Sequence, residues 1–259
     1  MSIVGFKCVA TDENVSFKDC IACALTCENK CHLTADILTG IMENVTEERS
    51  TISITKMIGC MRSTYLSTKY DTYASPEKLY WAFRGTLAHA VIEKYNADKE
   101  AILETKFART VNGIKITGTP DIIIPTKELI RDYKTTKQVP YYSRPYPNHE
   151  VQLNLYRWLV RPKYKIERLE IVYMDMMKTK IIPVKKLWKL SDCEDYVAKH
   201  SAILAKAQKD DIPPPVPAEF PLYWQCNDFC EGKAKCAEFY QEELRKDYDK
   251  WCAEEWSKC

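Results

Sequence analysis

Two carboxylates and a lysine stand at a spacing in this sequence that could hold a metal ion. Residues 121–132 read as two short strands joined by a tight turn. Antiparallel pairing about that turn places Asp121 opposite Asp132, and Lys134 projects from the same face two residues later. Facing carboxylates repel unless a cation lies between them, and hard oxygen ligands suit Mg²⁺ or Mn²⁺. The spacing therefore predicts a divalent metal site beside Lys134.

A predicted helix over residues 75–96 could supply a third ligand. It starts at Ser75-Pro76, with Ser as N-cap and Pro at the first helical position. His89 could complete the metal site, and Gly85 on the same helical face would permit a close approach. An apolar stripe predicts packing of this helix against the core: Leu79, Phe83, Leu87 and Val91.

The remaining pattern favours an α/β or α+β fold. Apolar patterns at 102–109 and 114–117 flank Asn112-Gly113, which is a strong hairpin signal. A helix follows over residues 148–160, and then two strands and another helix. That order excludes an all-helical bundle. The first of these two helices brings together two polar side chains at i, i+4, Gln152 and Tyr156.

Each of these matches is weak when it is taken alone. The short (D/E)xK pattern also fits Glu104-Thr105-Lys106 and Glu231-Gly232-Lys233. A single His on a helix is more often solvated or packed than a ligand, and two carboxylates could merely flank a turn. The order of the matches and their shared faces favour the functional interpretation.

Cysteines crowd both ends of the chain, which contains twelve. In a reducing compartment, such clusters indicate metal ligands rather than disulfides. We expect zinc on Cys8, Cys20, Cys23 and either Cys27 or Cys31. Cys31 is preferred, because Cys23 and Cys27 would share one helical turn. Two alternatives stay open. Cys20, Cys23, Cys27 and Cys31 could hold an iron–sulfur cluster without Cys8, or the cysteines of the head could be free thiols.

Composition and segment patterns limit the class of protein. Lys and Arg number 38 and Asp and Glu 36, a balance that neither requires nor excludes a nucleic-acid partner. No apolar run approaches the ~18 residues of a membrane helix, and residues 1–10 lack signal-peptide features. We expect a cytoplasmic protein with no membrane partner. Its expected regions are a cysteine-rich head (1–35), a core that includes Cys60 (36–212) and a C-terminal segment (213–259).

Motifs along residues 55–240 resemble those of RecB-like PD-(D/E)xK nucleases. In chain order they are Gly85-x-x-x-His89, Gly118-Thr119-Pro120-Asp121, Asp132-Tyr133-Lys134 and Gln152-x-x-x-Tyr156. Cys60 before them and Cys226-x₃-Cys230-x₅-Cys236 after them resemble the iron–sulfur branch of that family. Within the branch, size and layout are most similar to the CRISPR-associated Cas-four nucleases. Two features depart from the pattern: x₃ where x₂ is expected, and the cysteine-rich head.

The resemblance implies a restriction-endonuclease-like core with a mixed sheet flanked by helices, and Mg²⁺- or Mn²⁺-dependent DNA cleavage. His89, Asp121, Asp132 and the carbonyl of Tyr133 would hold one or two ions. Lys134 would position a water and neutralise charge on the phosphate. Two further residues, Gln152 and Tyr156, would orient the lysine or contact DNA. A 4Fe–4S cluster would be bound by Cys60, Cys226, Cys230 and Cys236.

The expected substrate is single-stranded DNA or an overhang. Tyr141, Tyr142 and Arg144 could clamp it, although a solvated or packed role suits each of them equally. The resemblance also implies antiviral defence, with DNA trimmed for CRISPR spacer acquisition and the spacer-integrase complex as partner. A non-catalytic iron–sulfur DNA-binding subunit of a repair or recombination complex and a redox protein stay open. The intact acidic set favours the enzyme, because neither alternative uses it.

Overall fold

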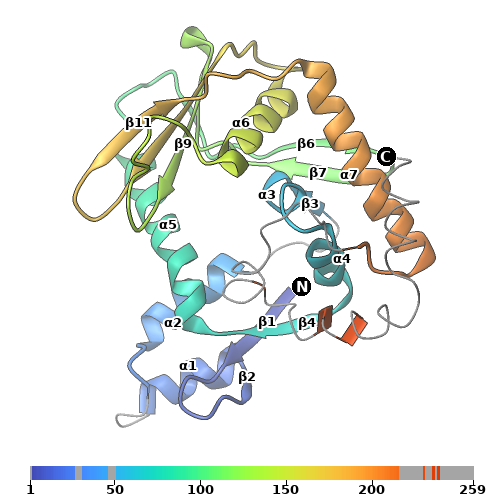
Figure 1. Cartoon of the computed structure of the whole chain (residues 1–259). Coiled ribbons are helices and arrows are strands. Elements are labelled where there is room, and N and C mark those ends of the chain that lie inside the picture. The colour runs from blue at the N-terminus through green and yellow to red at the C-terminus, as the bar shows by residue number, and fades with distance from the viewer. Residues whose placement is uncertain are drawn as a thin grey trace. The chain divides into compact units, whose positions relative to one another are not determined.

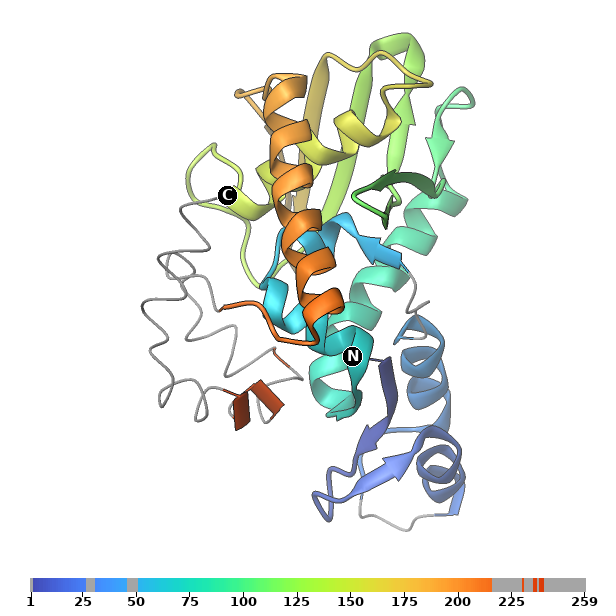
Figure 2. The same ribbon diagram turned by 90° about the vertical axis from the view of Figure 1, so that its right-hand side faces the viewer.

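The computed structural model describes residues 2–26, 31–45, 51–215, 230, 235–236 and 238–239. The chain divides into two compact units. The first, called here the head unit, comprises Met1–Ser50, Gly59–Phe83 and Ile203–Cys259; the second, the sheet unit, comprises Thr51–Ile58 and Arg84–Ala202. Figures 1 and 2 show the elements of both units from two sides. Within the described part of the chain, no helix is both long and apolar enough to cross a membrane.

The sheet unit contains a five-stranded mixed sheet in the order β11-β10-β9-β8-β5. β9 and β10 run parallel, and the other neighbours are antiparallel. All three residues of β8 are buried, as its run of isoleucines requires. The predicted α/β core with a mixed sheet is thus confirmed. The strands are β5 (Ile102–Leu103), β8 (Ile122–Ile124), β9 (Leu129–Thr135), β10 (Arg168–Met174) and β11 (Thr179–Pro183).

A second sheet in the same unit has three strands, in the order β3-β7-β6. The helix α6 (Pro147–Val160) contacts β6 and β7 of this sheet and β9 and β10 of the other (Figure 1). α6 therefore joins the two sheets through its buried face. The other elements here are β3 (Thr51–Ser53), α3 (Ile54–Met57), β6 (Phe107–Val111), β7 (Ile114–Gly118) and α7 (Leu190–Asp210), which continues into the head unit.

Both predicted hairpins are confirmed. Asn112 and Gly113 have φ values of 51° and 76°, the left-handed geometry that a two-residue hairpin turn needs. In the second hairpin Ile122 pairs with Arg131 and Ile124 with Leu129, the register predicted from the sequence. A single 3₁₀ turn, Pro125–Lys127, closes this hairpin. The pairing leaves Asp121 at the entrance of β8.

The expected single strand over 102–109 is wrong. β5 pairs with β8 in the five-stranded sheet, whereas β6 pairs with β7 in the other sheet. The chain changes sheets just after β5, where Glu104 has a φ of 39°. This left-handed conformation is uncommon for a residue other than glycine, and it turns the strand out of line.

The expected long helix is confirmed as α5 (Pro76–Lys94), but its apolar stripe is only partly buried. Leu79 and Phe83 pack against the core of the head unit. Leu87 and Val91 are exposed, because the second half of the helix turns another face inward. On that face Ile92 packs against the apolar cluster of β8 and β9, and Gly85 lies next to Thr135.

The head unit is built around a small three-stranded sheet in the order β2-β1-β4. Phe6, Leu33, Leu38 and Ile41 form its buried core, and Cys20 and Cys31 pack against that core. The cysteines of the head therefore lie beside a real apolar cluster. The elements are β1 (Ser2–Lys7), β2 (Asn14–Ser16), α1 (Phe17–Thr26), α2 (Ala35–Val45), α4 (Met61–Lys69) and β4 (Asp71–Ala74).

Gly118→Ala should destabilise the protein. A Cβ at Gly118 would lie 2.8 Å from both Leu159 and Tyr156 of α6, so the strand or the helix must move. Overpacking of this kind costs about 1–3 kcal/mol. Gly85→Ala is the control: its Cβ would meet nothing closer than 3.5 Å, and helix propensity favours Ala by about 1 kcal/mol. Urea unfolding measures both, and equal stability of the two variants would contradict the packing argument.

Candidate active site

Asp132 on β9 is a buried carboxylate with incomplete pairing. Its side chain is 1% exposed, and Oδ2 lies 2.8 Å from Nζ of Lys134. Oδ1 has no hydrogen-bond partner among the described residues. Buried carboxylate oxygens are normally paired, so an unpaired one calls for an explanation. A bound cation is the simplest explanation.

Asp121 adds a second carboxylate to the same place. The backbone N–H of Tyr133 donates to its Oδ2 at 2.6 Å, which fixes the side chain between β8 and β9. Burial, and then the negative charge of Asp132, raise the pKa of Asp121 to about 7. Burial and mutual repulsion therefore both oppose ionisation of the two carboxylates. A cation bound between them would relieve both effects.

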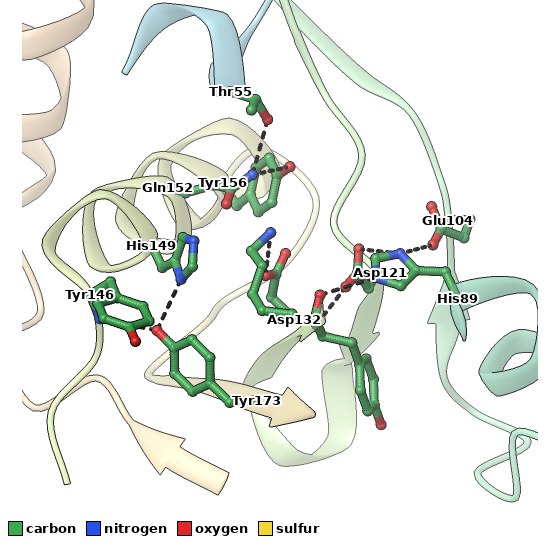
Figure 3. Close-up of polar contacts among 12 residues, drawn as sticks. Thr55, His89, Glu104, Asp121, Asp132, Tyr146, His149, Gln152, Tyr156 and Tyr173 are labelled. Carbon is green, nitrogen blue, oxygen red and sulfur yellow. Dashed lines mark hydrogen bonds and ion pairs between the residues drawn. The ribbon is translucent and has the colours of Figure 1, made fainter. Parts of the chain in front are cut away.

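His89 of α5 lies beside Asp121 and the backbone of Tyr133. Its Nδ1 lies 3.5 Å from Oδ1 of Asp121 and 3.4 Å from Oε1 of Glu104 (Figure 3). Its Nε2 lies 3.0 Å from the carbonyl oxygen of Tyr133. In the protonated ring, Nε2 donates to that carbonyl and Nδ1 faces the carboxylates, and a cation bound through Nδ1 would replace the proton there. One nitrogen and two carboxylate oxygens, from His89, Asp121 and Glu104, lie within 4.8 Å of one another.

Glu104 is a site residue that sequence reasoning missed. In the sequence, Glu104 stands out only as the start of a second (D/E)xK match. The expected single strand over 102–109 gives it no place near Asp121. The pairing of β5 with β8 brings Glu104 opposite Asp121, and its N–H donates to the Asp121 carbonyl at 3.1 Å. Its carboxylate is the strongest influence on His89, whose pKa is raised to about 9. No local pattern predicts this contact, because it depends on the pairing of β5 with β8 rather than with another strand.

Gln152 and Tyr156 project from α6 over the acidic pair. The Gln152 amide donates to the hydroxyl of Tyr156 and to Oγ1 of Thr55, each at 3.0 Å (Figure 3). Burial, and then the charges of Asp132 and Asp121, raise the pKa of Tyr156, so its hydroxyl stays protonated. The structure therefore brings together all five residues expected to be catalytic: Asp121, Asp132, Lys134, Gln152 and Tyr156.

A second group missed from the sequence lies on the far side of the lysine. Nδ1 of His149 lies 2.9 Å from the hydroxyl of Tyr173, which also accepts the N–H of Tyr146 at 3.0 Å (Figure 3). Burial, and then the positive charge of Lys134, lower the pKa of His149 to about 3. His149 is thus a neutral neighbour of Lys134 that holds the start of α6 in place.

Three of the four cysteines expected at the cluster are described, and all lie in the head unit. Cys60 is the N-cap of α4, and Sγ of Cys230 lies 3.7 Å from Oγ of Ser63 on that helix. Burial, and then Cys236 and Cys230, raise the pKa of the Cys60 thiol. The charges of Cys236 and Cys230 thus influence Cys60, although these three sulfur atoms do not form a group within 4.8 Å of one another. Cys226, the fourth, lies outside the described residues.

The head cysteines also gather. Cys8 follows β1, Cys20 and Cys23 lie on α1, and Cys31 lies in the segment before α2. Burial, and then Cys31, Cys8 and Cys23, raise the pKa of Cys20 to about 11. The four residues expected to bind zinc are thus neighbours. Cys27 lies outside the described residues.

Comparison with known proteins gives one family and several similar structures. The PD-(D/E)XK nuclease superfamily matches residues 84–237, more than half of the chain. No curated protein matches the sequence significantly. The crystal structure of SSO0001 is similar at a TM-score of 0.57 and 20% identity, over 78% of this chain and 94% of that one. A phage-related exonuclease from Haemophilus somnus 129PT has a TM-score of 0.41 and 12% identity, over 66% of this chain and 99% of that one.

Glu104→Gln should weaken Mn²⁺ binding by at least about tenfold, because it removes an anionic oxygen beside His89 and Asp121. Isothermal titration with Mn²⁺ and no DNA measures this directly. Glu93→Gln is the matched control, since Glu93 is exposed one turn beyond His89 on the same helix. An unchanged affinity in Glu104→Gln would remove Glu104 from the metal site.

Proposed function

Because the chain belongs to the PD-(D/E)XK nuclease superfamily, we propose that it is a metal-dependent nuclease that cleaves DNA. The observation that carries this proposal is the buried carboxylate of Asp132, with one unpaired oxygen, beside Asp121 and Lys134. A purely structural ion pair would need one carboxylate for one lysine. A second buried carboxylate is costly unless a cation also binds.

The donor set suits Mg²⁺ or Mn²⁺. Asp121, Asp132 and His89 would hold the ion, with Glu104 as a further oxygen donor. The donor atoms of His89, Asp121 and Glu104 already converge, whereas Asp132 lies outside that group and would join it through its unpaired Oδ1. The carbonyl of Tyr133 is also a proposed ligand, for an ion held through Nε2 of His89 rather than through Nδ1, because Nε2 and that carbonyl oxygen lie 3.0 Å apart. When bound, such an ion lowers the pKa of a water and stabilises the charge that develops on the phosphate.

Lys134 supplies positive charge rather than a base. Burial lowers its pKa, but the charges of Asp132 and Asp121 outweigh that effect and raise the pKa above its ordinary value. The amine therefore stays protonated. It can neutralise a phosphate oxygen or orient a water, but it cannot take a proton from that water at neutral pH.

Gln152 and Tyr156 act as positioning residues in this proposal. Both are buried, and their mutual hydrogen bond is anchored on Thr55. They close the site above the two carboxylates and leave the Tyr156 hydroxyl facing the negative charges that raise its pKa. They would hold that side of the site in one geometry around the reacting phosphate.

The substrate and biological setting extend this proposal. The order of the motifs and the flanking cysteines supports cleavage of single-stranded DNA or overhangs, by exonuclease or endonuclease action. The same features support a role in trimming DNA for CRISPR spacer acquisition, with the spacer-integrase complex as partner. A non-catalytic DNA-binding subunit would retain the fold without needing the paired carboxylates.

Asp132→Asn should abolish Mg²⁺- or Mn²⁺-dependent cleavage of a labelled single-stranded oligonucleotide, by more than about a hundredfold, while leaving the fold intact. The substitution keeps the shape of the side chain but removes the charge that binds the cation. Asp98→Asn is the control, because Asp98 forms an Asp–Lys pair with Lys127 at 2.8 Å outside the site. Gel analysis of products and circular dichroism report activity and fold.

Cleavage by Asp132→Asn at the wild-type rate would reject this site. Wild-type protein that binds DNA tightly but never cleaves it, with either metal, would support the non-catalytic subunit instead. Loss of activity in Asp98→Asn would show that the assay reports stability rather than chemistry.

We also propose a 4Fe–4S cluster on Cys60, Cys226, Cys230 and Cys236. Thiolates alone suit such clusters or zinc. The support is the approach of Cys230 to α4, whose N-cap is Cys60, across a large separation in sequence. A cluster that closes so long a loop would stabilise the head unit.

For the head we propose a zinc ion on Cys8, Cys20, Cys23 and Cys31. Cys20 and Cys31 pack against the same small apolar core. The charges of all three other thiols raise the pKa of Cys20. The sulfur atoms of the described cysteines do not form a group of three within 4.8 Å. Zinc binding would therefore draw the β1–β2 hairpin, α1 and the segment after it closer together.

Anaerobically purified protein should contain about four iron atoms and about one zinc per chain. Cys60→Ser should remove the iron and its brown colour but keep the zinc, whereas Cys20→Ser should do the reverse. Cys193→Ser is the control, because Cys193 is a buried thiol on α7 outside both sets. Elemental analysis decides: zinc without iron contradicts the cluster, and iron for one cluster without zinc removes the head site.

A further inference from the structure

Two loops of the sheet unit expose an unusual set of large apolar side chains. Tyr141 and Tyr142 are 88% and 76% exposed, and Met176 and Met177 are 78% and 91% exposed. These are the four most exposed large hydrophobic residues in the described part of the chain. They are called here the exposed rim. Grouped apolar side chains in water indicate a surface that binds something.

Asp175 fastens the two loops of the rim to each other. Its Oδ2 accepts the N–H of Val139 at 3.1 Å, from the loop that carries the tyrosines. Its Oδ1 accepts the N–H groups of Met177 and Lys178, each at 2.8 Å, from the turn that carries the methionines. One carboxylate thus holds both halves of the rim together.

Lys180 provides a second fastening. Its Nζ donates to the carbonyl oxygens of Pro140 and Tyr141, each at 3.0 Å, from β11. At the base of the loop, the N–H of Thr136 donates to the carbonyl of Met174 at 2.8 Å. These bonds fix the backbone under the tyrosines, so that the rings are presented in one place. A prepositioned surface loses less entropy when it binds.

The rim lies at the edge of the sheet that carries Lys134. β9 and β10 are parallel, with Lys134 paired to Tyr173 and Thr135 to Met174. The tyrosine loop leaves the carboxyl end of β9, and the methionine turn leaves the carboxyl end of β10. In sheets of this kind, ligands bind outside the carboxyl ends of parallel strands. The rim is therefore next to the proposed active site along both strands.

We propose that the exposed rim is a stacking platform for unpaired bases, which holds single-stranded DNA beside Lys134. The inference rests on the proposed nuclease function and names the surface that would hold the single strand. Tyrosine rings and polarisable thioethers offer flat or soft apolar contacts to any base, and only an unpaired strand exposes base faces. Arg144 and Lys178 are exposed on the same loops and supply charge for the phosphates.

The test measures binding by fluorescence anisotropy in EDTA, so that no cleavage occurs. The probes are a labelled single-stranded oligonucleotide and a blunt duplex of the same length. Replacing both tyrosines, Tyr141→Ala with Tyr142→Ala, should weaken single-strand binding by at least about tenfold, because stacking contributes ~1–3 kcal/mol per base. Duplex binding should change by no more than about twofold. Met176→Ser with Met177→Ser should have a smaller effect in the same direction.

Two control variants make the result specific to stacking. Tyr141→Phe with Tyr142→Phe keeps the aromatic faces and should bind like the wild type. Tyr95→Ala removes a tyrosine that is 72% exposed elsewhere in the sheet unit and should also bind like the wild type. Equal melting temperatures of all variants show that the fold is intact.

The platform is rejected by any of three results. These are unchanged single-strand affinity in the alanine variant, an equal loss of single-strand and duplex binding, or a change of oligomeric state that identifies the rim as a contact between copies of the chain. A separate assay with Mg²⁺ and with Mn²⁺ tests cleavage. If the wild type cleaves DNA but the rim variants bind it normally, the platform is rejected and the proposed nuclease function is retained. Rim-dependent binding without cleavage rejects the nuclease and leaves a single-strand-binding surface.

Discussion

The sheet unit is organised around two carboxylates that are held together where little water can reach them. Asp132 is almost fully buried on β9, and Asp121 lies at the entrance of the neighbouring strand. Burial and mutual repulsion both oppose their ionisation, as the raised pKa of Asp121 shows. A fold can hold such a pair only by surrounding it with positive charge and hydrogen-bond donors.

The surroundings of the pair meet part of that requirement from two elements, β9 and α5. Lys134 follows on the same strand, the N–H of Tyr133 binds Asp121, and His89 approaches from α5. None of these groups satisfies Oδ1 of Asp132 within the described part of the chain. The remaining negative charge is what makes a cation the natural partner of this site. In the proposed function, the protonated lysine would supply charge to a phosphate and would not act as a base.

The two sheets are needed for that arrangement. The chain passes from one sheet to the other at Glu104, and the same change of direction puts this carboxylate beside His89. α6 packs on both sheets, and the absence of a side chain at Gly118 lets Tyr156 and Leu159 approach the strand. The position of Tyr156 and Gln152 above the carboxylates therefore follows from packing. The parallel ends of β9 and β10 then place two exposed loops beside the lysine.

The sequence by itself determined the features that depend on local pairing. The hairpin of β8 and β9 has the predicted register, because side chains alternate strictly and the turn between the strands is short. Asp121, Asp132 and Lys134 could therefore be placed on one face from their numbers alone. The helix that carries His89 was likewise predictable from Ser75-Pro76 at its start, and the helix that carries Gln152 from its extent. The inward face of the second half of α5 and the N-cap of α6, Tyr146, were not.

Only the tertiary structure decided which distant segments meet. Glu104 reaches His89 because β5 pairs with β8 rather than continuing into β6, a choice made by long-range packing. His149 of α6 contacts Tyr173 of β10 near Lys134. The turn that carries Met176 lies beside the loop that carries Tyr141, because β9 and β10 run parallel and Asp175 accepts the N–H of Val139. Local sequence patterns fix the faces of single elements. The partners of those faces are set by the burial of apolar surface across the whole unit, which no short pattern records.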